Sequence, residues 1–253
     1  MSRIISIHSF RGGTGKSNTV ANLSALFAKQ GLRVGIIDTD IQSPGIHVLF
    51  GMDEDNMGKT LNDYLYDRCD IEEAAHDVTH RLGVSIEGRI FLVPSSIDPS
   101  DIAYVIRHGY EPAKLNDGFE DLLDALELDV LMVDTHPGLN DETLLSIAVS
   151  DILILILRPD QQDYQGTHVT VQVARKLHVP LMHLFVNKVP QSLAMDDVRE
   201  QVQKTYACPV SAVLPHSDEM MELASTGIFT LHYPDHPISK QLETAVAELL
   251  VPA

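Results

Sequence analysis

The sequence contains no tryptophan and only two cysteines, and aromatic residues make up 6% of it. Cys69 and Cys208 are far apart and form no Cys-x-x-Cys pair, which argues against a disulfide framework and a local cysteine metal site. The longest wholly apolar run, residues 152–157, is much too short to cross a bilayer. These absences predict a cytoplasmic protein without a membrane-spanning segment.

Basic residues are also scarce. The chain has 18 Lys and Arg against 36 Asp and Glu, a formal net charge of −18, which argues against a dedicated, strongly basic nucleic-acid surface. Cations exceed acids locally in residues 175–204, and any contact with a polyanion is expected there. The cations of this segment are Arg175, Lys176, Lys188, Arg199 and Lys204, and its acids are Asp196, Asp197 and Glu200.

Residues 10–17 are the most informative segment, a glycine-rich loop that reads Phe-Arg-Gly-Gly-Thr-Gly-Lys-Ser. The apolar run 4–8 predicts a strand before it, and the spacing of apolar residues over 17–30 predicts a helix after it. Glycines let the loop N–H groups converge on an anion, and the helix N-terminus adds the positive end of its dipole. We expect Lys16 to reach the β- and γ-phosphates of a nucleotide and the Ser17 hydroxyl to bind Mg²⁺. The predicted nucleotide-binding residues of the loop are Gly12, Gly13, Thr14, Gly15, Lys16, Ser17 and Asn18.

Six further apolar runs predict buried strands, and helical patterns separate most of them. These runs are residues 33–38, 90–93, 130–133, 152–157, 181–186 and 210–214. Strands that alternate with helices predict an α/β, doubly wound fold with a mainly parallel sheet, helices on both faces and ligands at the carboxyl ends of the strands. We expect a single domain over residues 1–253. The acidic segment 51–88 is expected to cover one edge of the site.

Two of the predicted strands end in an aspartate. The strand at 33–38 ends in Asp38, with Asp40 two residues later, and the run at 130–133 is followed by Asp134. An aspartate after a strand is often only a helix cap or a turn residue. Together with the glycine-rich loop, however, these carboxylates are expected to orient water on Mg²⁺. The predicted metal ligands are therefore Ser17, Asp38 and Asp134, and Asp38 or Asp40 is expected to position the attacking water.

The chain resembles the deviant Walker A ATPases of the ParA and MinD type over nearly its whole length. Their loop typically reads Lys-Gly-Gly-x-Gly-Lys-Ser/Thr, and residues 11–17 depart from it at Arg11. Residues 38–42 resemble the first switch of that family. Residues 134–138, Asp-Thr-His-Pro-Gly, resemble the second, which usually reads Asp-Thr-Pro-Pro-Gly. The resemblance implies a P-loop fold, ATPase activity and ATP or ADP with Mg²⁺ as ligands, and we expect Gly138 to donate its N–H to the γ-phosphate.

The base expected in this site is adenine. Residues 187–190 read Asn-Lys-Val-Pro, and Pro190 lacks the carboxylate with which a guanine site accepts from the base. The Asn187 side chain can both donate and accept, which suits N6 and N7 of adenine. The resemblance places Asn187 and Pro215 beside the base. Asn18 stands where the family usually has a threonine, which leaves the contact to the α-phosphate open.

The signature lysine of that family is replaced here by Arg11. In family members this lysine reaches across a nucleotide-sandwich dimer to the phosphates of the other subunit. Arg11 keeps the charge, but its guanidinium is planar and bulkier than an ammonium, so the two side chains are not interchangeable. Either Arg11 acts in trans or another cation does. The second candidate is Arg158, whose alternative role is a salt bridge to Asp160 or Asp163.

The leading functional hypothesis from this resemblance is a positioning ATPase that works as a partition switch. Its ATP-bound homodimer would bind DNA without sequence preference, and a cargo-bound adaptor protein would accelerate slow hydrolysis and release it. The changed signature residue suggests the ATPases that distribute carboxysomes in cyanobacteria. The expected location is cytoplasmic and nucleoid-associated.

Two alternatives stay open. A membrane-associated regulator of the MinD type needs a basic amphipathic tail, whereas the predicted helix 238–250 has only Lys240 as a cation and is expected to pack on its own domain. An ATP-dependent biosynthetic ligase of the same fold could close segment 51–88 over a small substrate. An iron-protein type electron carrier would need paired cysteines beside the switches, and Cys69 and Cys208 do not provide them.

Overall fold

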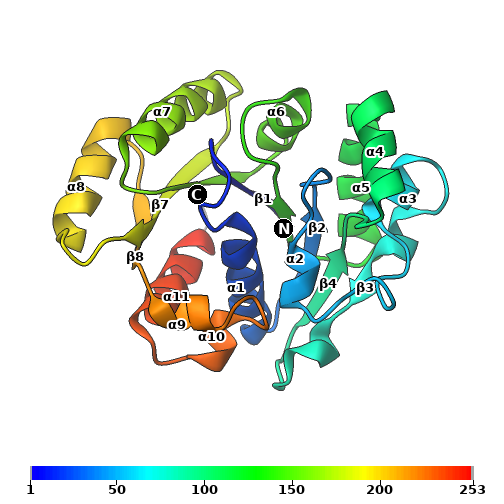
Figure 1. Cartoon of the computed structure of the whole chain (residues 1–253), viewed down its shortest axis with the longest axis horizontal. Helices are drawn as coiled ribbons and strands as arrows, with labels where there is room; N and C mark the ends of the chain where they lie inside the picture. Colours follow the sequence, from blue (N-terminus) through cyan, green and yellow to red (C-terminus); the bar gives the residue numbers. More distant parts are fainter. Residues whose placement is uncertain (1, 252–253) are drawn as a thin grey trace.

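The computed structural model describes residues 2–251 and confirms the predicted α/β architecture (Figure 1). Its eight strands form one sheet in the order β3-β4-β2-β5-β1-β6-β7-β8. All neighbouring strands are parallel except β3 and β4. The strands are β1 (Arg3–His8), β2 (Arg33–Asp38), β3 (His76–Asp77), β4 (Arg89–Val93), β5 (Val130–Asp134), β6 (Ile152–Leu157), β7 (Leu181–Val189) and β8 (Val210–Pro215).

Helices cover both faces of this sheet, as the doubly wound prediction requires. The α-helices are α1 (Lys16–Lys29), α2 (Ile46–Leu49), α3 (Leu61–Leu65), α4 (Pro99–His108), α5 (Pro112–Ala125), α6 (Asp141–Ala148), α7 (Gln161–Lys176), α8 (Met195–Tyr206), α9 (Asp218–Glu222), α10 (Phe229–His232) and α11 (Pro237–Leu249). Helices α1, α10 and α11 pack on one face, and α5 to α8 pack on the other. Within residues 2–251, no helix combines the length and apolar content that a membrane crossing needs.

The strands are continuous apolar runs because both of their faces are buried. Strand β6 shows this most clearly, since all six of its residues are buried. Its three isoleucines pack in the core beneath α1 and α11, whereas its three leucines pack in the core beneath α7 and α8. A strand in such a position gains about 25 cal/mol for each Å² of apolar surface buried on either side.

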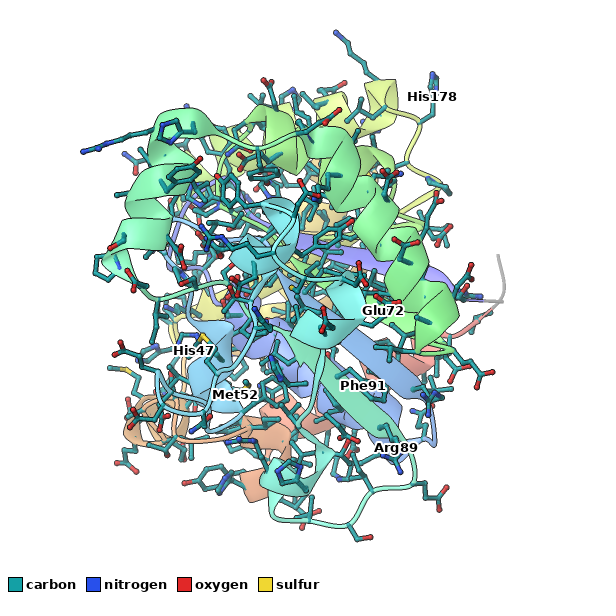
Figure 2. The ribbon with its side chains drawn as sticks, turned by 90° about the vertical axis from the view of Figure 1, so that its right-hand side faces the viewer. His47, Met52, Glu72, Arg89, Phe91 and His178 are labelled. Carbon is teal, nitrogen blue, oxygen red and sulfur yellow. The ribbon has the colours of Figure 1, made fainter. Side chains whose placement is uncertain are left out.

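Segment 51–88 covers the edge of the sheet and not the edge of the site, so that expectation was wrong. It contributes β3, which pairs with β4, and two short 3₁₀ helices, η1 (Ile71–Ala74) and η2 (Thr79–Leu82). Figure 2 looks onto this side of the molecule, where β4 carries Arg89 and Phe91. The sheet edge is apolar here, and Ile71 packs with Phe91 in its core. Burial of that edge therefore decides where the segment lies.

Parallel pairing aligns the carboxyl ends of the central strands, and this alignment assembles the site. In the register of the sheet, Asp38 on β2 lies directly beside Asp134 on β5, and Ile7 on β1 lies on the other side of Asp134. The loop that leads from β1 to α1 therefore follows the strand next to Asp134, with Asp38 one strand further along the sheet. The predicted gathering of these segments at one edge of the sheet is confirmed.

Candidate functional site

The loop between β1 and α1 has the conformation of an anion cradle. Gly13 and Gly15 have φ angles of 75° and 103°, in the left-handed region that favours glycine. Gly15 is the N-cap of α1 and gives it no side-chain hydrogen bond, so the first N–H groups of the helix stay available to a ligand. A Cβ at Gly15 would lie 2.5 Å from Nδ2 of Asn187, which donates to the Thr14 carbonyl over 2.8 Å. Backbone conformation and close packing both require a glycine at this position.

A cavity of about 540 Å³ opens in front of this loop, within the size range of small-molecule sites. Several predicted site residues line it, namely Gly12, Gly13, Gly15, Lys16, Ser17, Asn18, Asp40, Asn187 and Pro215. Other lining residues were not among the predicted site residues, and they include Asn22, Ser43, Lys188, Leu214, Met220 and Leu242. The apolar members of this second group sit beside Pro215 and give the cavity one apolar wall, which suits a planar base.

Asp38 and Asp134 form a buried acidic pair behind the loop. Burial and the neighbouring Asp134 raise the pKa of Asp38, although the N–H groups of Asp40 and Gly45 donate to its carboxylate over 3.0 and 3.4 Å. Burial also raises the pKa of Asp134 to about 6, and the nearby Ser17 hydroxyl and then the charge of Lys16 oppose this rise. Two ionised carboxylates that lie side by side in a buried site repel each other. Their ionised forms therefore destabilise the fold unless a cation binds between them.

This donor set fits Mg²⁺. Both carboxylate oxygens of Asp134 are buried, and no group within residues 2–251 donates a hydrogen bond to them. An unpartnered buried carboxylate is rare in proteins, and hard cations such as Mg²⁺ take oxygen ligands of this kind. Ser17 lies at the second position of α1, on the wall of the same cavity. Asp38, Asp134 and Ser17 are therefore the residues that would hold the ion.

A buried histidine supports the loop from below. His8 ends β1 and shares a hydrogen bond of 2.8 Å between its Nδ1 and the Thr135 hydroxyl. Burial first, and the charge of Lys16 second, lower the pKa of His8 to about 3. His8 is therefore neutral at physiological pH, whereas the cation Lys16 lies on the cavity wall.

The two predicted switch loops touch each other. Nδ1 of His136 lies 2.7 Å from Oδ1 of Asp40, and the Ser43 hydroxyl donates to the same oxygen over 2.9 Å. Gly138 has a φ angle of 86°, and its N–H donates to the Ser9 carbonyl over 3.1 Å. In this conformation the turn folds back onto the end of β1, and the role of this N–H toward the γ-phosphate stays a prediction.

Neither of the two candidate cations for the signature role lines the cavity. Nη1 of Arg11 lies 3.3 Å from Oδ1 of Asp163 and 3.5 Å from Oδ1 of Asp160. Nε of Arg158 lies 3.0 Å from Oδ2 of Asp163, so the salt bridge considered as its alternative role is the one the structure contains. Burial would raise the pKa of Asp163, but the bonds from Arg158 outweigh it and lower that pKa. Phe10 packs against Gly166 and holds the loop next to α7.

Asn187 and Lys188 close the opposite side of the phosphate loop. Oδ1 of Asn187 accepts from the N–H of Lys188 over 2.8 Å, so both ends of this amide already have protein partners. Lys188 has a φ of 57° at an irregular end of β7, and its Nζ donates to the Gly13 carbonyl over 2.8 Å. A strand-end bulge re-aims a side chain in this way. The sequence signal was present, since Lys188 follows a predicted strand just as Asp38 ends one.

Comparison with known proteins agrees with this site. The AAA domain model AAA_31 matches residues 2–183. An uncharacterized ATP-binding protein of Methanocaldococcus jannaschii is 26% identical over 253 residues, with 99% of this chain and 88% of the relative covered. An iron-sulfur cluster carrier protein of Pseudomonas fragi is 25% identical, with 93% of this chain and 81% of the relative covered.

The fold has solved counterparts. The septum site-determining protein MinD of Pyrococcus horikoshii, solved with Mg-ADP, has a TM-score of 0.80 and 22% identity, and the match covers 99% of this chain and 96% of that one. The family model spans the phosphate loop and both aspartate-bearing strands, and the likeness in fold extends over the rest of the chain. The chain belongs to the AAA_31 family of P-loop ATPases and shares the fold of MinD.

Proposed function

We propose that the chain binds ATP and ADP with Mg²⁺ and works as a switch that dimerises around ATP and separates after hydrolysis. The observation that carries this proposal is the position of Arg11. Its side chain is 39% exposed beside the phosphate loop, where it pairs with Asp160 and Asp163, and it does not line the cavity of its own chain. A cation placed in this way is suited to the nucleotide of a second subunit.

The residues of one subunit would prepare the hydrolysis. The loop N–H groups and Lys16 hold the phosphates, and Asp40 on the cavity wall positions the attacking water. Asp38, Asp134 and Ser17 hold Mg²⁺, which when bound supplies charge neutralisation at the phosphates. Arg11 of the second subunit adds positive charge where negative charge develops. Loss of the γ-phosphate removes that contact, so hydrolysis weakens the dimer.

A protein adaptor is the partner that the surface charge of this chain favours. Three of the five cations in residues 175–204 are occupied by backbone carbonyls. Arg175 donates to Tyr206, Arg199 to Val210 and Lys188 to Gly13. Nonspecific DNA binding needs several cations aimed outward at phosphates, and this segment offers few. An iron-sulfur carrier role finds no support in the cysteines, because Cys69 and Cys208 lie in two different core clusters.

Light scattering coupled to size exclusion tests the dimer. We expect Asp40→Ala, which slows hydrolysis strongly but leaves a measurable residual rate, to run as a dimer with ATP and Mg²⁺ and as a monomer with ADP. Adding Arg11→Ala to that variant should return it to a monomer that still binds ATP. Lys29→Ala is the matched control, because Lys29 is an exposed cation at the far end of α1. A monomer that is saturated with ATP in the Asp40→Ala variant would contradict the proposal.

The same samples test the partner class. A DNA-coated sensor surface should retain little of the ATP-bound dimer at physiological salt, whereas a cognate adaptor should accelerate ATP hydrolysis. Strong ATP-dependent retention that falls steeply with salt would instead show that the dimer binds nonspecific DNA. In that case the outward cations Lys176 and Lys204 are the first positions to substitute.

A further inference from the structure

The contact between His136 and Asp40 joins two loops that are 96 residues apart in sequence. Asp40 lies between β2 and α2, and His136 lies between β5 and α6. Their side chains are only 15% and 23% exposed, so water competes weakly for the bond between them. The His136 carbonyl accepts from the Thr143 hydroxyl over 3.4 Å, which ties this loop to α6. The histidine therefore brings a fixed donor to Asp40.

The bond also decides which oxygen of Asp40 is available. His136 and Ser43 both donate to Oδ1, and within residues 2–251 no protein group donates to Oδ2. Two donors on one carboxylate oxygen fix the plane of the group. Because Asp40 lines the cavity, Oδ2 is the oxygen left to accept a hydrogen bond from a water there.

Without these donors, electrostatics would move Asp40 away. Asp38 is two residues before it, and Asp134 is the next carboxylate on the adjoining strand. Both raise the local negative charge, and a partly exposed carboxylate relaxes from such neighbours by turning toward solvent. A hydrogen-bond donor on the far side of Asp40 opposes that rotation.

We propose that His136 is a positioning residue for hydrolysis. It fixes Asp40 with Oδ2 toward the attacking water and so couples the two switch loops. This inference rests on the role proposed above for Asp40. Within residues 2–251, His136 does not line the cavity and has no hydrogen bond to Ser17, Asp38 or Asp134. Either form of its ring that carries a proton on Nδ1 can donate this bond, so the role does not depend on a change of charge.

A double-mutant cycle tests this role. We expect His136→Ala to lower kcat for ATP hydrolysis on the order of 10- to 100-fold, since small misplacements of a catalytic group cost this much. KM for ATP and the affinity for ADP should change less than about threefold, because the phosphate cradle is untouched. His136→Asn should restore most of kcat, since its amide N–H can take the place of Nδ1–H. In the Asp40→Ala background, His136→Ala should have no further effect on the rate.

The outcomes separate this inference from the function on which it rests. If the wild type hydrolyses ATP and His136→Ala is equally active, the inference about His136 is overturned and the proposed function stands. The same holds if the effects of Asp40→Ala and His136→Ala on the hydrolysis rate multiply. Loss of ADP affinity in His136→Ala would also overturn it, because the residue would then support the fold of the loop. A wild type that binds ATP and never hydrolyses it would overturn the proposed function as well. His168→Ala removes an exposed histidine on α7 and is the matched control, since it should leave kcat unchanged.

Discussion

Asp134→Asn is expected to stabilise the protein when neither Mg²⁺ nor nucleotide is present. The wild-type carboxylate is 1% exposed, its oxygens have no protein donor, and burial raises its pKa from an ordinary 3.8 to about 6. Such a difference corresponds to about 3 kcal/mol of destabilisation of the ionised native state. Asparagine has the same shape without the charge, and its unpaired amide resembles the protonated acid. The substitution should therefore recover most of that energy at neutral pH.

The sign of the pH dependence follows from linkage. Below pH 3.8 the carboxyl is protonated in both the folded and the unfolded chain, and it contributes no penalty. Between pH 3.8 and about 6 the unfolded chain loses its proton first, so wild-type stability falls as the pH rises. Above about pH 6 the penalty is constant. The advantage of Asp134→Asn should therefore be smaller at pH 5 than at pH 7.5, where it reaches about 3 kcal/mol.

Urea unfolding in EDTA at these two pH values measures the difference. Asp121→Asn, at an exposed position of α5, is the matched control and should change stability little at either pH. Added Mg²⁺ and ADP should stabilise the wild type more than Asp134→Asn, because the carboxylate then has its cation. An Asp134→Asn variant less stable than the wild type at pH 7.5 would contradict this expectation. An advantage that stays the same at both pH values would also refute it.

Three further predictions concern the loop and its surroundings. Gly15→Ala should weaken ADP binding at least about tenfold and destabilise the fold by about 1–3 kcal/mol, since the Cβ meets Asn187 at 2.5 Å; near-normal calorimetric titration with ADP would contradict this. Asp163→Asn removes the buried partner of Arg158 and should lower the free energy of unfolding in urea by about 2 kcal/mol, a figure already reduced for the partial exposure of the guanidinium. A loss below about 0.5 kcal/mol would show that the ion pairs among Arg11, Arg158, Asp160 and Asp163 add little stability. Lys188→Gln should weaken ADP binding about three- to tenfold without changing the urea midpoint, because the side chain is exposed and lies at the cavity; unchanged affinity would show that it serves only the loop.

The strands and the phosphate loop could be predicted because their signals are local. The residues of β6 are apolar at every position, and the loop before Lys16 needs glycine for reasons of backbone conformation alone. Segment 51–88 was misplaced because its position depends on an apolar sheet edge that only the assembled strands create. Strand β3 was not predicted for the same reason, since two residues carry no periodicity.

The site divides in the same way. Asp38 and Asp134 could be predicted because each ends an apolar strand, and parallel pairing brings such ends together. The hydrogen-bond and ion-pair partners of the charged side chains could not be predicted from the sequence. From the sequence, Arg158 could either contact a phosphate or form a salt bridge. Only the packing of α7 places Asp163 where it pairs with both Arg158 and Arg11.

Local sequence patterns are enough to predict the fold class, the phosphate loop and the strand-end aspartates, because hydrophobic periodicity and glycine conformation act over a few residues. Which polar groups meet depends on how the whole chain packs. It joined His136 to Asp40, brought Lys188 to the loop and turned the Gly138 N–H to Ser9. Hydrogen bonds and ion pairs act over about 3 Å, so they depend on distances that are fixed only once the sheet and its loops have packed.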